Sequence, residues 1–346
     1  MPSIMQSEVR QAPHVVADLI QADADAYARL AADWRARPPT HIVTVARGTS
    51  DFAAMHFGYL VMARLGHIVT SLPMSLFTLE RSPLDCAALT CLAWSQSGRS
   101  PDLLLPTQTI RAGGGRTVAI VNALDSPLAA AAETVLPRHA GPERSVAATK
   151  SLVAQLVVGV RLLAAWADDA ELAAAIHALP ARLAAALAAD WSAALPVIQD
   201  ADQLFVVGRG AGLAMAAEAA LKCKEVVGLP AEAFSGAEVR HGPMTLIGAG
   251  FPLLVLAPRG AAQAGLIDFA VEMAGRGAQV LLAATEGTVV PATSNLLRLP
   301  LVAAPRPELD GICAILGVYL LLEAAARARG RDPDHPPHLS KVTCTL

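Results

Sequence analysis

A repeat at one fixed offset is the feature of this sequence that most restricts its fold. Short apolar runs that stop at turn-forming residues occur in the first half of the chain and return in the second half. Matching positions of these runs are 162 residues apart in every case: Arg47 and Arg209, Gly98 and Gly260, Thr117 and Gln279. Three pairs in register at a single offset indicate two copies of one domain.

The apolar runs have the composition of buried strands and alternate with stretches of helical character. Predicted strands lie at residues 41–46, 89–94 and 117–121, and again at 204–207, 253–256 and 279–282. Strands that alternate with helices are typical of parallel sheets with crossover helices. The sequence therefore predicts an α/β fold with two tandem, doubly wound domains, each a parallel sheet flanked by helices.

Four segments are predicted along the chain. A helical N-terminal segment covers residues 1–38, with its helix at 9–34 ended by two prolines. The first domain covers 39–190 and the second 196–330, followed by a C-terminal tail at 331–346. An alanine-rich stretch at 167–194, read as helices broken near Pro180, joins the two domains.

The composition excludes several classes of protein. Of the 346 residues, 54% are hydrophobic and 16% are charged, which excludes global disorder, and a net charge of −3 excludes the basic field of a nucleic-acid binder. The five cysteines form no CxxC pair, and the first 20 residues lack a secretory signal pattern. The longest apolar run, about 11 residues at 312–322, is shorter than the roughly 20 needed to span a bilayer. We therefore expect a soluble cytoplasmic protein without nucleic-acid or membrane partners.

Lysine is rare among the basic residues. Only four of the 27 are lysines: Lys150, Lys222, Lys224 and Lys341. Lysine can lose its proton and act as an amine, whereas arginine is effectively always charged. A lysine retained in an arginine-rich chain is a candidate for chemistry, and the alternative is chance retention on the surface.

Hydroxyl and glycine residues follow two predicted strands of the first half. Residues 48–50 read Gly-Thr-Ser, and residues 95–98 read Ser-Gln-Ser-Gly. Open parallel sheets bind ligands beyond the carboxyl ends of their strands, where backbone N–H groups and helix N-termini suit a phosphate. Ser100, followed by Pro101, is expected to cap the next helix. The alternative is a pair of ordinary turns; no nucleotide-binding glycine motif is present in the sequence.

Three charged residues share one face of a predicted helix at 213–227. Glu218, Lys222 and Glu225 have the spacing i, i+4, i+7 in an otherwise apolar stretch. A carboxylate held near an ammonium can move a proton between adjacent carbons. The alternative is a solvated stripe of ion pairs.

Histidines outside the apolar runs provide two further candidates. His241 precedes Gly-Pro and is expected on a loop, where it is suited to proton transfer to a ring oxygen unless its role is structural. His335, His338 and Cys344 near the C-terminus lack the spacing and the fourth ligand of a metal site. No metal or other cofactor is predicted.

Six motifs together resemble the double sugar-isomerase (SIS) domain family. They lie in this order along nearly the whole chain: Arg-Gly-Thr-Ser at 47–50, Ser-Gln-Ser-Gly at 95–98, Ala-Gly-Pro-Glu-Arg-Ser-Val-Ala-Ala-Thr-Lys at 140–150, Glu-Ala-Ala-Leu-Lys-Cys-Lys-Glu at 218–225, Arg-His-Gly-Pro at 240–243 and His-Leu-Ser-Lys at 338–341. The family includes the isomerase half of glucosamine-fructose-6-phosphate aminotransferase. The chain is most similar to the SIS-type glucosamine-6-phosphate deaminases, because residues 97–102 follow their Ser-Gly-Arg-Ser-Pro-Asp pattern.

The resemblance implies a role for each matching residue. The sugar 6-phosphate would be held by Thr49, Ser50, Ser95, Gln96, Ser97 and Ser100. Val146 would line the sugar, and Glu225 would move the proton between C1 and C2. Lys222 and Glu218 would flank the reacting carbons. His241 would open the pyranose ring in the neighbouring subunit's site, which implies a homodimer, and Lys341 would contact the carbonyl carbon or form a Schiff base with it.

The expected activity is conversion of glucosamine 6-phosphate to fructose 6-phosphate and ammonia. Deamination of galactosamine 6-phosphate and deglycation of a fructosamine 6-phosphate are enzymatic alternatives, because the motifs are shared. A non-catalytic sugar-phosphate sensor is the alternative from another class. It is disfavoured because the catalytic set is retained and fewer than 40 residues precede the first predicted strand.

Overall fold

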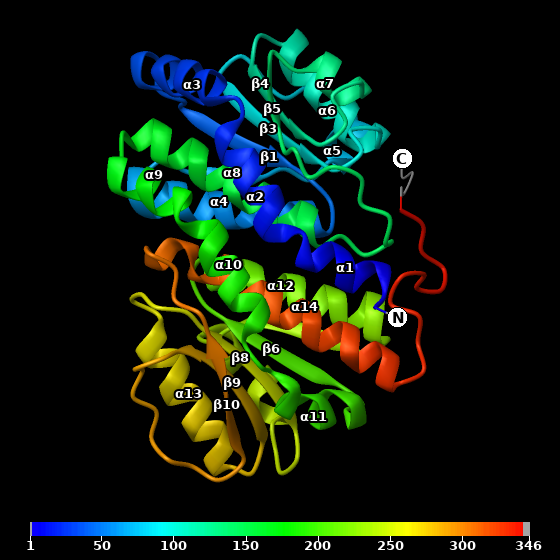
Figure 1. Cartoon of the computed structure of the whole chain (residues 1–346). Helices are drawn as coiled ribbons and strands as arrows, with labels where there is room; N and C mark the ends of the chain where they lie inside the picture. Colours follow the sequence, from blue (N-terminus) through cyan, green and yellow to red (C-terminus); the bar gives the residue numbers. More distant parts are fainter. Residues whose placement is uncertain (1, 342–346) are drawn as a thin grey trace. The chain divides into compact units, whose positions relative to one another are not determined.

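The computed structural model describes residues 2–341 and divides the chain into two compact units. Of these residues, the β1–β5 unit comprises 14–143, 150–177 and 339–341, and the β6–β10 unit comprises 2–13, 144–149 and 178–338. Each unit contains one five-stranded sheet in which the paired strands are parallel (Figure 1).

The sheet of the β1–β5 unit has the strand order β2-β1-β3-β4-β5. Its strands are β1 (His41–Val45), β2 (Val69–Ser71), β3 (Leu89–Ser95), β4 (Arg116–Val121) and β5 (Thr134–Pro137). The helices of this part of the chain are α2 (Ala12–Gln21), α3 (Ala24–Ala36), α4 (Thr49–Leu65), α5 (Ser75–Thr78), α6 (Pro101–Ala112), α7 (Pro127–Ala131), α8 (Lys150–Ala167) and α9 (Ala170–His177). Apolar residues that alternate along β1, β3 and β4 pack with α6 and α7 on one face of the sheet.

The sheet of the β6–β10 unit has the order β10-β9-β8-β6-β7. Its strands are β6 (Leu204–Gly208), β7 (Ala231–Ser235), β8 (Pro252–Ala257), β9 (Gln279–Thr285) and β10 (Leu296–Leu301). Its α-helices are α1 (Ile4–Arg10), α10 (Leu179–Ala188), α11 (Leu195–Asp200), α12 (Gly212–Lys222), α13 (Gln263–Gly275) and α14 (Asp310–Ala328). A π-helix, η2 (Cys223–Val227), continues α12, and short 3₁₀ turns are η1 (Ser192–Ala194), η3 (Glu238–Arg240), η4 (Pro243–Leu246) and η5 (Pro307–Leu309).

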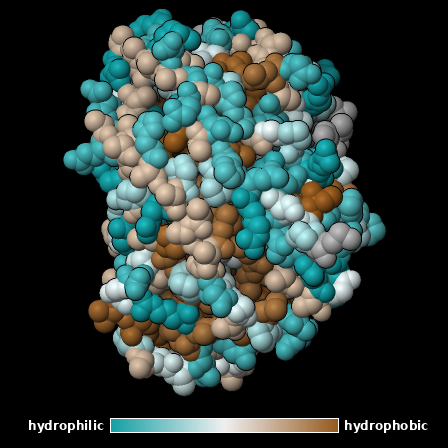
Figure 2. All heavy atoms as spheres, in the orientation of Figure 1, coloured by the Kyte–Doolittle hydropathy of each residue, from teal (hydrophilic) through white to brown (hydrophobic). Residues whose placement is uncertain are grey.

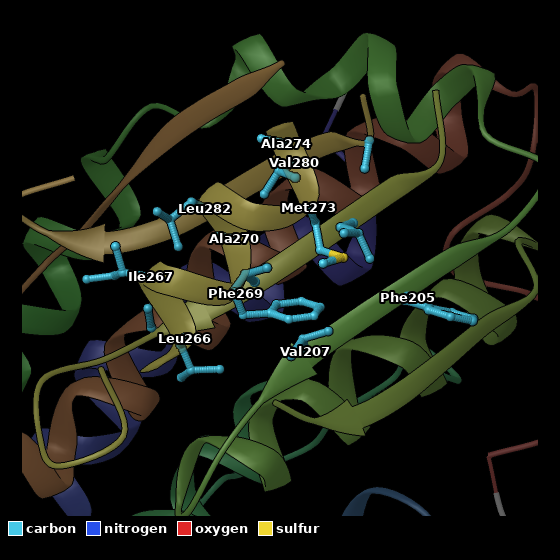
Figure 3. Close-up of a cluster of buried hydrophobic side chains, with 14 of the residues drawn as sticks. Phe205, Val207, Leu266, Ile267, Phe269, Ala270, Met273, Ala274, Val280 and Leu282 are labelled. Atoms are coloured by element: carbon cyan, nitrogen blue, oxygen red, sulfur yellow. The ribbon is translucent and has the colours of Figure 1, made fainter. Parts of the chain in front are cut away.

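The core of this unit shows why the sheet needs helices on both faces. Phe205 and Val207 of β6 belong to the same buried apolar cluster as Phe269 and Met273 of α13 (Figure 3). The intervening Val206 is equally buried on the opposite face, which α12 contacts. Successive strand residues face opposite sides of a sheet, so a run of consecutive apolar residues requires cover on both.

The N-terminal helical prediction is right in type but wrong in extent. Residues 9–34 are divided among α1, α2 and α3 instead of forming one helix. Pro13 has no N–H to donate and therefore interrupts the hydrogen-bond ladder between α1 and α2. Asp23 has a left-handed backbone (φ 55°), which separates α2 from α3.

Within residues 2–341, two helices are long and apolar enough to cross a membrane by length and composition alone. They span Lys150–Ala167 and Pro307–Ala328, and 83% and 89% of the respective apolar windows are buried inside the protein. If the bent pair α9 and α10 is counted as one span, there are three. The face of the molecule in Figure 2 shows hydrophilic side chains interspersed among hydrophobic ones.

Candidate functional site

The β1–β5 unit brings the predicted phosphate loops to one edge of its sheet. β1 and β3 are adjacent and parallel, with Val45 opposite Ala93, so the turns that follow both strands lie at the same edge. Ser50 lies in the first turn of α4, and Ser95 is the last residue of β3. Gly98 has φ 63°, and a Cβ there would meet the Ser126 hydroxyl at 2.1 Å, so this turn needs glycine.

Hydrogen bonds within the loop after β3 fix its shape. The amide of Gly98 donates to Ser95 Oγ at 3.0 Å, and the amide of Arg99 donates to Ser97 Oγ at 3.3 Å. Gln96 and Ser97 are half-buried. Ser100 occupies the N-cap position of α6 as predicted, but its hydroxyl makes no capping hydrogen bond. The N-terminus of α6 follows the loop and carries the partial positive charge of a helix N-terminus, which suits an anion, and the buried carboxylate of Asp102 lies in its first turn.

Two residues that were not among the predicted site residues hold these loops. Gln155 of α8 is fully buried and donates from Nε2 to Ser50 Oγ at 2.9 Å. Arg47 Nε contacts the buried carboxylate of Asp102 at 2.8 Å and so links the loop after β1 to α6. A buried amide in the apolar run 152–160 was the available signal for Gln155.

The tail lysine has a defined partner in the same unit. Lys341 Nζ donates to Glu143 Oε2 at 2.9 Å. The Glu143 carboxylate is fully buried and also accepts from the amide and hydroxyl of Ser151, at 3.1 and 2.6 Å. The predicted tail is described only as far as Lys341; Cys344 and its neighbours lie outside the described residues.

The β6–β10 unit contains the charged cluster predicted from helical spacing. Lys222 Nζ lies 3.3 Å from Glu218 Oε1 and 2.6 Å from Glu225 Oε2. The side chains of Lys222 and Glu218 are 1% and 0% exposed, whereas that of Glu225 is 23% exposed. The three residues therefore do not form a solvated stripe: two are in the core and one reaches the surface.

A tyrosine from α14 completes this cluster. Tyr319 is buried, and its hydroxyl donates to Glu218 Oε1 at 2.7 Å. Burial alone would lower the pKa of Lys222, but the charges of Glu218 and Glu225 outweigh it and raise this pKa above its ordinary value. Lys222 is therefore a fixed cation at neutral pH.

The helix changes its winding within the cluster. α12 ends at Lys222, and residues 223–227 form a π-helix that closes on Gly228 in a left-handed conformation (φ 63°). π-Helical turns are rare and occur frequently at functional sites. Here the wider turn contains Glu225, the partly exposed member of the cluster.

His241 and Val146 also lie in this unit but outside the cluster. His241 is exposed after η3, and within residues 2–341 its ring makes no hydrogen bond or ion pair. Gly242, with φ 137°, provides the turn into η4. Val146 is half-buried in the loop 144–149, and its amide donates to the Asp334 carbonyl at 3.1 Å.

Metal-binding geometry is absent from residues 2–341. No group of three or more His, Cys, Asp or Glu side chains there is arranged to hold an ion. His335 is exposed and pairs with Asp332 at 3.0 Å, and His338 has a left-handed backbone (φ 67°).

Comparison with known protein families shows to which family this chain belongs. The family model for the SIS domain matches residues 37–165 and 197–322. The chain belongs to the SIS domain family. The two matched regions and the two parallel sheets confirm the predicted α/β fold of tandem SIS domains.

Individual relatives of this SIS protein have names that refer to sugar phosphates. Glutamine–fructose-6-phosphate aminotransferase (isomerizing) from Zymomonas mobilis is 31% identical over 97% of this chain and 58% of its own length. The chain thus spans a little over half the length of the curated relatives that it matches. A protein from Silicibacter pomeroyi DSS-3 described as a candidate phosphosugar isomerase is 40% identical, with a TM-score of 0.90 over 96% of this chain and 100% of its own.

A further solved structure supports the fold. Glucosamine-6-phosphate deaminase from Thermotoga maritima has a TM-score of 0.77 over 99% of this chain and 100% of its own, at 20% identity. Together the comparisons place this chain among the SIS proteins related to phosphosugar isomerases.

Proposed function

We propose that this SIS protein is an amino-sugar phosphate deaminase that converts glucosamine 6-phosphate and water to fructose 6-phosphate and ammonia. The observation that supports it best is the cluster on α12 and the π-helix. It holds one carboxylate, Glu225, at the surface and fixes it with the buried ammonium of Lys222 at 2.6 Å. A fixed, accessible carboxylate beside a permanent cation suits a reaction that moves a proton between two carbons.

The proposed reaction has three steps. His241 assists opening of the pyranose ring, which yields an aldehyde at C1 and an amine at C2. With the C2 amine present as its ammonium, Glu225 removes the C2 proton while an ammonium proton moves to O1, which gives a neutral enolamine. Glu225 then returns its proton to C1, which leaves an iminium at C2 and a hydroxyl at C1. Water then adds to the iminium and ammonia leaves, so that the ketone of fructose 6-phosphate forms. Proton transfer by a positioned side chain contributes typically about 10²–10⁴-fold to such steps.

The remaining residues are assigned by chemistry. The phosphate is proposed to bind the hydroxyl-rich loops of the β1–β5 unit, where Ser50, Ser95 and Ser97 occupy neighbouring strand ends. Lys341 is proposed to contact the carbonyl carbon. We further propose a homodimer in which His241 serves the neighbouring subunit, which agrees with its exposed position. Light scattering tests the dimer, and a fully active monomer would contradict it.

The deciding experiment replaces the proposed base. Glu225→Gln keeps the shape of the side chain and removes its proton affinity, so ammonia release and exchange of the C2 hydrogen with deuterated water should both collapse. Phosphate affinity should survive, because the phosphate loops belong to the other unit. Glu308→Gln is the matched control: this carboxylate pairs with Arg306 at 3.0 Å and belongs to neither the charged cluster nor the proposed catalytic set, so its loss should leave exchange unchanged.

The same assay separates the alternatives. Near-normal exchange in Glu225→Gln would refute its role and make Glu218 the first suspect. A panel of glucosamine, galactosamine and fructosamine 6-phosphates assigns the substrate. A wild-type protein that binds these compounds without exchange or ammonia release would be a sensor.

A further inference from the structure

The loop that contains Val146 belongs to a different unit from the residues on either side of it. Residues Arg144–Thr149 pack with the β6–β10 unit, whereas Glu143 and Lys150 belong to the β1–β5 unit. The six residues of this loop therefore need contacts of their own with the β6–β10 unit, since neither flanking residue belongs to the unit in which the loop packs.

These contacts are hydrogen bonds donated by three consecutive backbone amides, those of residues 144–146. Glu8 of α1 is 4% exposed, and its two carboxylate oxygens accept from the amides of Arg144 and Ser145 at 2.5 and 3.2 Å. The next amide, that of Val146, donates to the Asp334 carbonyl at 3.1 Å. The first three backbone N–H groups of the loop therefore donate to segments that are distant in the sequence.

Asp334 and α14 in turn hold α1. The Asp334 carboxylate accepts from the amides of Ile4 and Met5 at 2.8 and 2.7 Å, which satisfies the first turn of α1. Ser3 at the N-cap donates to the buried carboxylate of Glu323 on α14 at 2.7 Å. The N-terminal helix is thus fixed at its start and presents Glu8 to the loop.

We propose that Glu8 and Asp334 are positioning residues that hold the backbone of residues 144–146, so that Val146 meets the sugar as part of the same unit as Glu225. This rests on the proposed function, in which Val146 lines the sugar. The bonds are made to backbone atoms, so they fix the path of the chain whatever side chains the loop displays. They involve no residue of the phosphate loops.

The test is Glu8→Gln, which keeps the size of the side chain but turns one acceptor oxygen into a donor. One of the two loop amides then faces an N–H and loses its partner. Because displacements of about 1 Å can cost roughly 10²-fold in turnover, we expect kcat/KM for glucosamine 6-phosphate to fall by about one to two powers of ten. The dissociation constant of inorganic phosphate, measured by calorimetry, should change less than about twofold.

A second measurement on the Glu8→Gln variant does not depend on catalysis. Hydrogen–deuterium exchange by mass spectrometry should show faster exchange of the amides at 144–146 in Glu8→Gln, with the peptides around residues 50 and 97 unchanged. Glu133→Gln is the matched control, because Glu133 also accepts a backbone amide, that of Thr117 at 3.1 Å. Asp334→Asn, which weakens the support of α1, should show the same changes to a smaller degree if Glu8→Gln does not fold.

Each outcome decides the proposal. Faster exchange at 144–146 with retained phosphate binding supports it, even if the wild type proves inactive on glucosamine 6-phosphate, in which case only the proposed function fails. Unchanged exchange overturns it. Equal losses of activity, phosphate affinity and thermal stability also overturn it, because they would show a general structural role.

Discussion

Removal of the buried ammonium should strongly destabilise the β6–β10 unit. Lys222→Met leaves the carboxylate of Glu218, which is fully buried, without its counter-charge 3.3 Å away. Breaking a buried pair by removing one partner costs about 3–5 kcal/mol, because an uncompensated charge stays in the core. At about 2–4 °C per kcal/mol for a domain of this size, the melting temperature should fall by roughly 6–20 °C.

Calorimetry at pH 7 measures this effect, with an exposed pair as reference. Arg276→Met removes the cation of an i, i+4 pair with Glu272, whose side chains are 46% and 35% exposed. An exposed pair of this kind contributes below about 1 kcal/mol. Equal losses in Lys222→Met and Arg276→Met would refute the electrostatic account of the cluster.

A double variant isolates the cause of the loss. Glu218→Gln combined with Lys222→Met removes the stranded charge as well as the cation, while Tyr319 can still donate to the amide oxygen. Glu225, at 23% exposure, can be hydrated and needs no replacement. Most of the lost stability should therefore return. If the double variant is no more stable than Lys222→Met, the loss comes from packing and not from charge.

Three buried side chains, Tyr319, Gln155 and Cys223, give further predictions. Tyr319→Phe removes a hydroxyl bonded to the Glu218 carboxylate and should cost about 1.5–3 kcal/mol in urea unfolding, a result contradicted by an unchanged midpoint. Gln155→Met removes the donor to Ser50 Oγ and should weaken inorganic phosphate binding about fivefold to tenfold by calorimetry; unaltered affinity would argue against a phosphate at this loop. Burial raises the pKa of the Cys223 thiol from 9.0 to about 12, so the folded protein keeps this proton while the unfolded chain loses it, and stability should decline as the pH rises above 9. Iodoacetamide at pH 9.5, followed by peptide mass spectrometry, should label Cys223 only at the rate of unfolding, and rapid labelling would contradict its burial.

The sequence predicted the interior strands and missed the edge strands. All six strands inferred from apolar runs occupy inner positions of the two sheets, whereas β2, β5, β7 and β10 lie at the edges. An inner strand of a doubly covered sheet is apolar on both faces and stands out as a continuous run. β2 and β10 contain exposed residues within them, so their pattern resembles that of a loop.

In the candidate site, neighbours that are close in the sequence were predicted and partners that are distant in the sequence were not. Glu218, Lys222 and Glu225 were predicted to share a face because helical spacing is local, and the ion pairs confirm that proximity. Tyr319 and Glu8 were not found, because each acts on a segment more than 100 residues away. Such partners are determined by tertiary packing, which a local sequence pattern does not reveal.

The division of the chain into units has a consequence for recombination between relatives. Because the β6–β10 unit is built from residues 2–13, 144–149 and 178–338, its parts are interleaved with those of the other unit along the gene. A chimera made by a single crossover in the alanine-rich connection would inherit Glu8 and the 144–149 loop from one parent and Asp334 from the other. Functional exchange of one half between homologues therefore requires three fragments to be transferred together. Libraries of shuffled sequences should retain few single-crossover survivors near residue 178 unless both parents share these anchoring contacts.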